Sequence, residues 1–301
     1  MAQMRTVAVV GASGNLGFYV VKALLAAGFV VTAVIRATSE APFPAEVIVK
    51  KTDFATVESV AAVLEGHDVV VSTLGTFAIS IQRQLIDAAI AARVQRFIPS
   101  EFGVDTRTLG SSKLAAIVSS KLEIINYLEE KSGQHDGFTW TALATGSFFE
   151  WGLNRGTFGI DLVAKTATIY DSGNEPFSPS TFSFVGQAVA ASLVQADKTR
   201  NKYLAVASFT ITQNELLKAI EEESGSKFVV EHASTLELEK LALEKLSKGN
   251  PTGVVDLMKV YLFKDGGAHQ LVFEGSGNDI LKLPEADLHA VLKHVLNTAE
   301  F

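Results

Sequence analysis

Three glycines near the N-terminus lie between a strand pattern and a helix pattern. Gly11, Gly14 and Gly17 follow the apolar, β-branched run Thr6–Val10, and helical spacing begins directly after them. In such a loop one glycine permits a tight turn, a second lets the backbone approach a pyrophosphate, and a third lets helix and strand pack closely. The helix N-terminus would offer the phosphates free N–H groups and a positive dipole end. We therefore expect the loop to bind a dinucleotide; a glycine-rich turn without a ligand is the alternative.

The residues after the second strand pattern indicate which dinucleotide is bound. The run Phe29–Ile35 ends at Arg36, and no acidic residue occurs before Glu40. An NAD site usually has Asp or Glu near this point to hold the ribose 2′-hydroxyl. Arg36 is instead a cation that can pair with a 2′-phosphate, and Thr38 and Ser39 can add hydroxyl donors. The sequence favours NADP(H) over NAD, with an ordinary exposed arginine as the alternative.

A lysine falls on the apolar stripe of a long helical pattern over residues 112–131. The stripe is defined by Leu114, Val118, Ile125 and Leu128. Lys121 fills the gap in this series, so helical spacing places it on the inward face. A buried ammonium needs a polar partner, or its pKa falls. A bound ribose or substrate would supply that partner. Alternatively, the side chain reaches the surface and pairs with a carboxylate.

Tyr127 and Lys131 show the Tyr-x-x-x-Lys spacing that short-chain dehydrogenases use for proton transfer. They stand at the end of the helical pattern, about one and a half turns or more beyond the expected cofactor position. We therefore do not assign them to the site. If Lys121 takes the lysine role, the tyrosine position is Ile117. The proton must then come from Lys121, from another side chain or from water.

Strand and helix patterns alternate through the first half of the chain. The strand patterns are Thr6–Val10, Phe29–Ile35, Val47–Val49, Val69–Ser72, Arg96–Ile98 and Thr139–Ala142. The helical patterns between them cover about 16–27, 57–64, 82–92 and 112–131. This alternation implies right-handed crossovers and an α/β fold, a Rossmann-type doubly wound parallel sheet.

The alternation weakens after about residue 150. Loops are expected over Gly152–Gly159 and Asp171–Ser183, and helices over Val185–Gln195, Gln213–Ser224, Leu236–Leu246 and Glu285–Leu296. We expect an NADP-binding domain over 1–155 that also takes in about 184–208. A smaller C-terminal α+β substrate lobe would comprise 156–183 and 209–301, at the carboxyl ends of the strands.

Charge and composition exclude several classes of function. The 301 residues carry a formal net charge of −7 and no cysteine. Such a chain does not suit nucleic-acid or anionic-membrane binding, and it has no thiolate ligands or disulfides. The six histidines show no metal-ligand spacing, and no apolar run is long enough for a membrane span. We expect a cytoplasmic protein without a metal; a homo-oligomer is left open.

Several segments resemble the NmrA-like family of atypical short-chain dehydrogenase/reductases, which includes the plant isoflavone and phenylcoumaran benzylic ether reductases. These segments are Gly11–Gly17, Arg96–Gly103 with its Pro-Ser-Glu-Phe-Gly run, Lys121 in mid-helix, and Thr139–Phe149. The resemblance spans nearly the whole chain. Thr166–Asp171 and Ala205–Phe209 are similar to fungal, isoflavone-reductase-like members in particular.

The resemblance implies cofactor contacts residue by residue. Those expected at the pyrophosphate are Gly11, Ser13, Gly14, Asn15 and Leu16. Arg36 would meet the 2′-phosphate. Those expected at the adenine-side ribose and the floor of the site are Thr73, Leu74 and Gly75. Those expected around the nicotinamide and its ribose are Pro99, Ser100, Glu101, Lys121, Thr145, Gly146 and Phe148.

The resemblance also implies catalytic and substrate contacts. Lys121 matches the family's catalytic acid–base or ribose anchor, and Glu101 would orient it. An apolar wall for a flat substrate would be formed by Phe102, Phe149 and Trp151. Core packing is the alternative for these rings. Gly146 is followed by a serine and two phenylalanines, so the substrate preference of the plant enzymes is not carried over.

The implied function is an NADPH-dependent oxidoreductase. Its substrate would be a flat, polycyclic secondary metabolite of aromatic or alkaloid type, reduced at a carbonyl, imine or activated alkene. Whether reduction is coupled to ring closure stays open. NmrA itself resembles these enzymes yet binds a transcription factor, so a non-enzymatic NADP sensor with a protein partner is the alternative. Lys121 on the inward face favours the enzyme.

Overall fold

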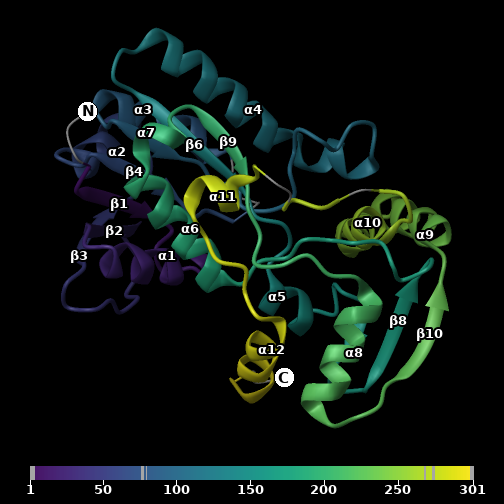
Figure 1. The fold of residues 1–301 in the computed structure, drawn as a ribbon. Coiled ribbons are helices and arrows are strands. Elements are labelled where there is room, and N and C mark those ends of the chain that lie inside the picture. The colour runs from purple at the N-terminus through teal and green to yellow at the C-terminus, as the bar shows by residue number, and fades with distance from the viewer. Residues whose placement is uncertain (1–3, 76–77, 79, 268, 273–274, 299–301) are drawn as a thin grey trace.

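The computed structural model describes residues 4–298 except 76, 77, 79, 268, 273 and 274. Within them, seven strands form one parallel sheet in the order β3-β2-β1-β4-β5-β6-β9 (Figure 1). The strands are β1 (Thr6–Val10), β2 (Val30–Arg36), β3 (Ile48–Thr52), β4 (Val69–Ser72), β5 (Arg96–Ile98), β6 (Thr139–Ala144) and β9 (Lys202–Ala205). The chain winds outward from β1 to β3 and then returns to continue from β4 on the other side. This is the predicted Rossmann-type, doubly wound order.

Helices cover both faces of this sheet (Figure 1). On one face α1 (Asn15–Ala26) packs against α6 (Phe182–Val194). The other face carries α2 (Val57–Leu64), α3 (Ile81–Ala91) and α4 (Lys113–Gln134). Successive side chains of a strand point to opposite faces of the sheet. Val7 and Val9 therefore pack in the core on the α1 and α6 face, and Ala8 and Val10 pack in the core on the α2, α3 and α4 face. The central strands are buried on both sides, which explains their continuous apolar runs.

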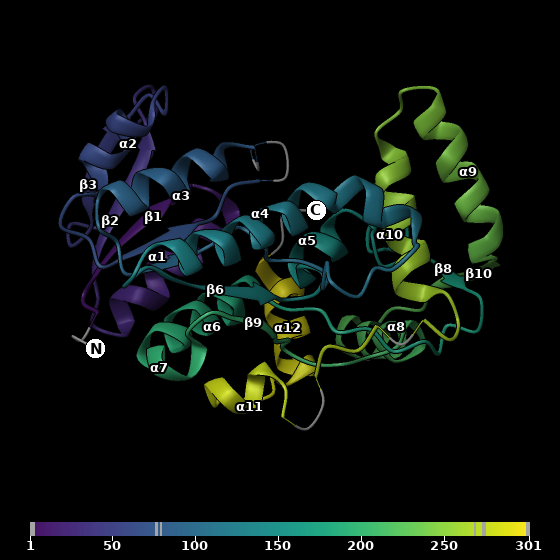
Figure 2. The ribbon, with the colours of Figure 1, turned by 90° about the horizontal axis from the view of Figure 1, so that it is seen from above.

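A smaller α+β lobe follows, as predicted, and lies beside the first in Figure 2. Its sheet has the order β10-β8-β7, with β8 parallel to β10 and antiparallel to β7. The strands are β7 (Ile160–Asp161), β8 (Thr166–Tyr170) and β10 (Val229–Ala233). The helices are α8 (Gln213–Ser224), α9 (Thr235–Ser247), α10 (Thr252–Phe263) and α12 (Leu288–Thr298). Aromatic rings, among them Phe158, Phe177 and Phe263, fill the core of this lobe.

Three further helices are short: α5 (Phe149–Asn154), α7 (Ala196–Thr199), which lies between α6 and β9, and α11 (Gly277–Leu281). Although α11 is late in the sequence, it contacts α6 and β9 of the first part. The proposed boundaries near 155 and 209 stay predictions. Across the described residues, no helix is long and apolar enough to cross a bilayer.

Several local expectations were wrong after residue 150. Helix α5 occupies part of the expected loop Gly152–Gly159. Helix α6 begins at Phe182, inside another expected loop, because the Thr181 hydroxyl caps it by accepting the Phe184 N–H at 3.1 Å. Strands β8 and β10 and helix α10 were not expected. Burial of α10 spreads over most of its last two turns, Leu257 and Val260–Phe263, which obscures the one-sided pattern that reveals surface helices.

Candidate active site

The glycine loop leaves the N-terminus of α1 open. Gly11 has a φ of +83°, and its carbonyl accepts the Gly14 N–H at 2.9 Å. A Cβ on Gly17 would stand 2.2 Å from the Gly11 carbonyl oxygen, and one on Gly11 would stand 2.9 Å from that of Thr73. Only glycine fits these two positions. Because Ser13, Gly14 and Asn15 are exposed, the free N–H groups at the start of the helix are accessible to an anion.

Arg36 stands at the same edge of the sheet as this loop. It is the last residue of β2, two positions beyond Val34, which is paired with Val10. Its side chain is exposed. The carboxyl ends of β1 and β2 therefore present a glycine loop and a cation beside each other, the arrangement that the sequence predicted for a phosphorylated ribose.

Hydrogen bonds tie together the segments that follow β4 and β5. Thr73 donates its N–H and its hydroxyl to the Val10 carbonyl at 2.8 and 2.9 Å. The Ser100 hydroxyl donates to the Leu74 carbonyl at 2.5 Å, and the Ser100 N–H donates to Oε1 of Gln82 at 2.6 Å. Gln82 is fully buried on α3 and was not anticipated as a site residue. Its only sequence signal was a polar residue on the inward side of a helical pattern.

Pro99 is buried beside Ser100, while Gly75 is exposed at the opening of the same segment. Leu16 is buried under the glycine loop. These three residues shape the backbone around the loop. Their contact with a cofactor stays a prediction.

Lys121 lies on the inward side of α4 and reaches the loop after β5. Its Nζ donates to the carbonyl of Glu101 at 2.8 Å and lies 3.5 Å from that of Phe102. Burial lowers the pKa of Lys121, and the negative charge of the Glu101 carboxylate opposes that shift. The ammonium is thus held by main-chain oxygens at the carboxyl end of β5, rather than at a surface edge.

The carboxylate of Glu101 is buried, with 1% of the residue exposed. Its Oε1 accepts hydrogen bonds from the hydroxyls of Thr106, at 2.6 Å, and Tyr203, at 2.8 Å. Burial raises the pKa of Glu101, while Lys121 and the two hydroxyl donors lower it. Thr106 and Tyr203 were not among the predicted site residues.

The loop after β6 is joined to the loop after β5. The N–H groups of Thr145 and Gly146 both donate to the Gly103 carbonyl, at 2.8 and 2.9 Å. Gly146 has a φ of +66°, and a Cβ there would stand 1.7 Å from the Ser178 carbonyl oxygen. The structure therefore brings Lys121, the Pro-Ser-Glu-Phe-Gly run and the Thr145–Gly146 loop to one edge of the sheet.

The aromatic residues expected near the site differ in burial. Phe149 is fully buried, with ring centroids 6.0 Å from Phe158 and 5.1 Å from Phe209. Phe102 is also buried in a core cluster. Core neighbours cover both rings, which favours the alternative of core packing, and their part in a substrate wall stays a prediction. Trp151, together with Phe148 from the predicted cofactor set, is only half-buried.

Tyr127 and Lys131 lie apart from this edge. The Tyr127 hydroxyl donates to Asp87 on α3 at 2.6 Å, and Lys131 is 3.9 Å from the same carboxylate. Burial and Asp87 raise the pKa of Tyr127 to about 12. The pair joins α4 to α3, which agrees with leaving it out of the site.

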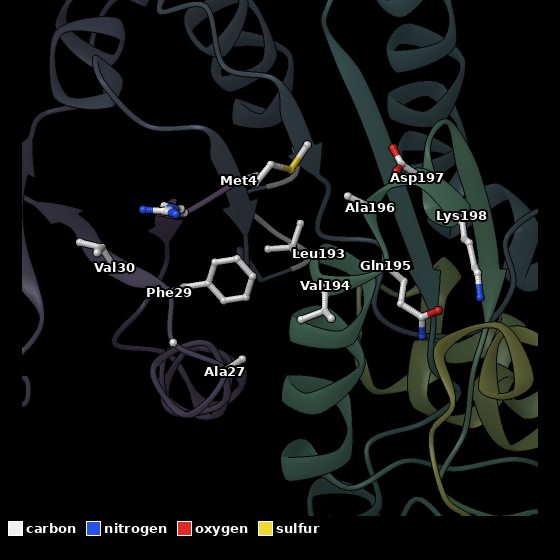
Figure 3. Close-up of a pocket in the computed structure, with 12 residues that line it drawn as sticks. Met4, Ala27, Phe29, Val30, Leu193, Val194, Gln195, Ala196, Asp197 and Lys198 are labelled. Carbon is white, nitrogen blue, oxygen red and sulfur yellow. The ribbon is translucent and has the colours of Figure 1, made fainter. Parts of the chain in front are cut away.

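The cavity drawn in Figure 3 lies at the other edge of the sheet. It has a volume of about 800 Å³ and is lined by Met4 and Phe29, which precede β1 and β2, and by Leu193–Lys198. Ligands of open parallel sheets bind at the carboxyl ends of the strands, so this cavity is not the predicted cofactor site. No group of three or more potential ligands that could hold a metal ion occurs in the part of the chain that the structure describes.

The sequence matches a known protein family and several of its members. The family model of the NmrA-like family matches residues 3–248. Oxidoreductase aprR of Aspergillus flavus is 40% identical over 295 residues, covering 96% of this chain and 98% of that protein. Isoflavone reductase homolog IRL of Zea mays is 30% identical over 240 residues, covering 73% of this chain and 74% of its own.

A solved structure of leucoanthocyanidin reductase from Vitis vinifera, in a binary complex with NADPH, has the same fold. It superposes with a TM-score of 0.79 at 20% identity and covers 97% of this chain and 100% of that one. Fold and loop geometry thus define a Rossmann-type α/β protein with a smaller second lobe. The chain belongs to the NmrA-like family.

Proposed function

We propose that the chain is an NADP(H)-dependent oxidoreductase that reduces a carbonyl, imine or activated alkene of a flat aromatic or alkaloid-type metabolite. The observation that carries the proposal is the position of Lys121, whose Nζ is held 2.8 Å from the Glu101 carbonyl directly after β5. A proton donor at this edge stands beside the loops where such folds receive their ligands. The oxidoreductase and reductase names of the relatives support this activity.

The residues at the carboxyl ends of β1 and β2 fit an NADP molecule. The exposed residues Ser13–Asn15 at the N-terminus of α1 suit the pyrophosphate, and the exposed guanidinium of Arg36 suits the 2′-phosphate. The NADPH complex of the structural relative supports the same cofactor. When bound, the nicotinamide supplies or accepts a hydride.

Lys121 would handle the proton that accompanies hydride transfer. In a carbonyl reduction, hydride adds to the carbon and the oxygen takes a proton from the ammonium. Because burial lowers its pKa, the ammonium gives up that proton more readily near neutral pH than an exposed lysine would. Glu101 orients Lys121, and Trp151 and Phe148 offer half-buried rings to a flat substrate. A cytoplasmic location and a small-molecule substrate are part of the proposal.

The test is substrate-dependent oxidation of NADPH on a panel of flat aromatic ketones, imines and enones. We expect Lys121→Ala to lower kcat by about a hundredfold or more, the usual contribution of a positioned general acid. The Kd for NADPH should stay within about threefold, because the phosphate contacts lie elsewhere. Lys131→Ala, which removes a lysine from the same helix, serves as the control and should retain activity.

Two outcomes contradict the proposal. Unchanged turnover in Lys121→Ala would remove this lysine from the mechanism. No turnover on any member of the panel, together with equal binding of NADP and NAD, would refute both the activity and the cofactor. That result would favour the non-enzymatic sensor.

A further inference from the structure

Tyr203, at the edge strand β9, forms part of the surroundings of Lys121. The Tyr203 hydroxyl donates to Oε1 of Glu101 at 2.8 Å across 102 positions of sequence. The hydroxyl of Thr106 donates to the same oxygen at 2.6 Å. Hydrogen bonds to an ionised carboxylate favour its charged form, so these two donors oppose the rise in the Glu101 pKa that burial causes.

The direction of the Tyr203 hydrogen bond is fixed by its neighbours. The Thr106 N–H, which can only donate, points to the Tyr203 oxygen at 3.2 Å. Burial and the Glu101 charge raise the pKa of Tyr203, so the phenol keeps its proton. Because its oxygen already accepts the Thr106 N–H, its own proton is directed to Glu101.

The ring of Tyr203 is held in place from one face. The guanidinium carbon of Arg107 lies 3.8 Å from the ring centroid. Asp105 binds that guanidinium through two hydrogen bonds of 3.0 and 2.7 Å. A cation over an aromatic face is attractive, and the bidentate pair fixes where the cation stands.

Glu101 connects this cluster to Lys121 in two ways. Its main-chain carbonyl accepts the Lys121 ammonium at 2.8 Å, so the backbone conformation at Glu101 sets where Nζ lies. Its carboxylate charge is the electrostatic influence that raises the pKa of Lys121 against burial. The charged groups acting on Tyr203 are Glu101, Asp105 and the Arg107 guanidinium.

We propose that Tyr203 and Thr106 are positioning residues that hold the Glu101 carboxylate ionised and in place, and through it keep Lys121 protonated and aimed at the substrate. This inference rests on the proposed role of Lys121 as proton donor. Neither hydroxyl takes part in proton transfer itself. Through Glu101, the two hydroxyls affect the fraction of Lys121 that is protonated and the position of its Nζ.

The test is the pH dependence of kcat/KM for NADPH-dependent reduction. The proton donor must be protonated, so the rate falls as pH rises through its pKa. Tyr203→Phe removes one donor from Glu101, which makes its charged form less favourable and weakens its support of Lys121. The descending limb should therefore move to lower pH, by about half a unit to one unit. Thr106→Val should act in the same direction, and Thr106→Ser, which keeps the hydroxyl, should restore the limb.

Tyr127→Phe is the matched control. It also removes a tyrosine hydroxyl that donates to a carboxylate, Asp87, but on the α3 side of α4. The limb should stay in place in this variant. A thermal unfolding curve and an NADPH titration for each variant separate a shifted lysine from a damaged fold.

If the descending limb of the kcat/KM pH profile does not move in either Tyr203→Phe or Thr106→Val, while Lys121→Ala is inactive, this inference is overturned and the proposed function stands. A limb that persists at the same pH in Lys121→Ala would show that another group donates the proton. That second result contradicts the proposed function itself.

Discussion

At the residue scale, two different properties matter at the carboxyl ends of β1 and β2: the small size of the glycines and the charge of Arg36. Gly11 and Gly17 are needed because their missing Cβ atoms leave room for the neighbouring backbone. Neither distinguishes one dinucleotide from another. We propose that Arg36, an exposed cation at the end of β2, makes this distinction. Since only NADP carries a 2′-phosphate, loss of this charge should affect one cofactor and spare the other.

We therefore expect Arg36→Ala to raise the Kd for NADPH by about ten- to a hundredfold, the value of one or two charge-assisted hydrogen bonds. The Kd for NADH should change by less than about threefold. Fluorescence titration with both nucleotides measures this difference. Lys22→Ala, which removes an exposed cation from the second half of α1, is the control. Equal losses for the two nucleotides would show that Arg36 does not contact the 2′-phosphate.

At the element scale, the loops after β5 and β6 act as one unit, because Thr145 and Gly146 bind the Gly103 carbonyl. Six of the seven strands of the first sheet were predicted from the sequence, because burial of the central strands on both faces leaves continuous apolar runs, whereas β9 was not predicted. The position of Lys121 on the inward face of α4 also followed from helical spacing. Helix α10 could not be predicted, because contacts with both α9 and α4 remove its one-sided pattern.

Gly146→Ala should disrupt the joined loops. Its left-handed φ and the clash with the Ser178 carbonyl should cost about 1–3 kcal/mol of unfolding free energy. Denaturant unfolding measures the loss. Gly133→Ala is the matched control, because a Cβ there meets nothing within 4 Å in the last turns of α4 and should be neutral or slightly stabilising. Equal stability of the two variants would show that the Gly146 loop relaxes freely.

His67 connects α2 to the first sheet and gives stability a pH dependence. Its Nδ1 is 2.9 Å from the Leu64 carbonyl and its Nε2 is 2.8 Å from the Thr32 hydroxyl. Burial lowers the pKa of His67 below its ordinary value of 6.5. The unfolded chain then binds this proton more readily than the folded one, so stability is present above that pH and lost as pH falls.

The expected slope below pH 6.5 is at most about 1.4 kcal/mol of unfolding free energy per pH unit from this one group. His67→Gln should remove that component, whereas His135→Gln, at the exposed end of α4, should leave it. Unfolding curves between about pH 5 and 7 compare the slopes. A wild-type slope in His67→Gln would assign the pH dependence to other groups.

At the scale of the whole molecule, contacts distant in sequence complete both the site and the fold. Tyr203 reaches Glu101 across 102 positions, and although the Pro-Ser-Glu-Phe-Gly run marks Glu101, no local pattern marks Tyr203 as its partner. The substrate-wall rings show the same limit: the Thr139–Phe149 segment points to an apolar cluster, but only packing against Phe158 and Phe209 reveals that Phe149 belongs to the core. Sequence spacing identifies which strand ends carry the site, while the tertiary fold decides which side chains face it.

The return of α11 to the first sheet joins the two parts into one structure. The Asn278 side chain donates to the Ala207 carbonyl at 2.8 Å and accepts the Ala207 N–H at 3.1 Å, directly after β9. Asn278→Leu leaves both buried backbone groups without these partners, so we expect a loss of about 2–4 kcal/mol of unfolding free energy. Exposed Asn154→Leu is the control. Calorimetry should show one transition that shifts down in Asn278→Leu. An unchanged transition would mean that α11 contributes little to joining the two parts.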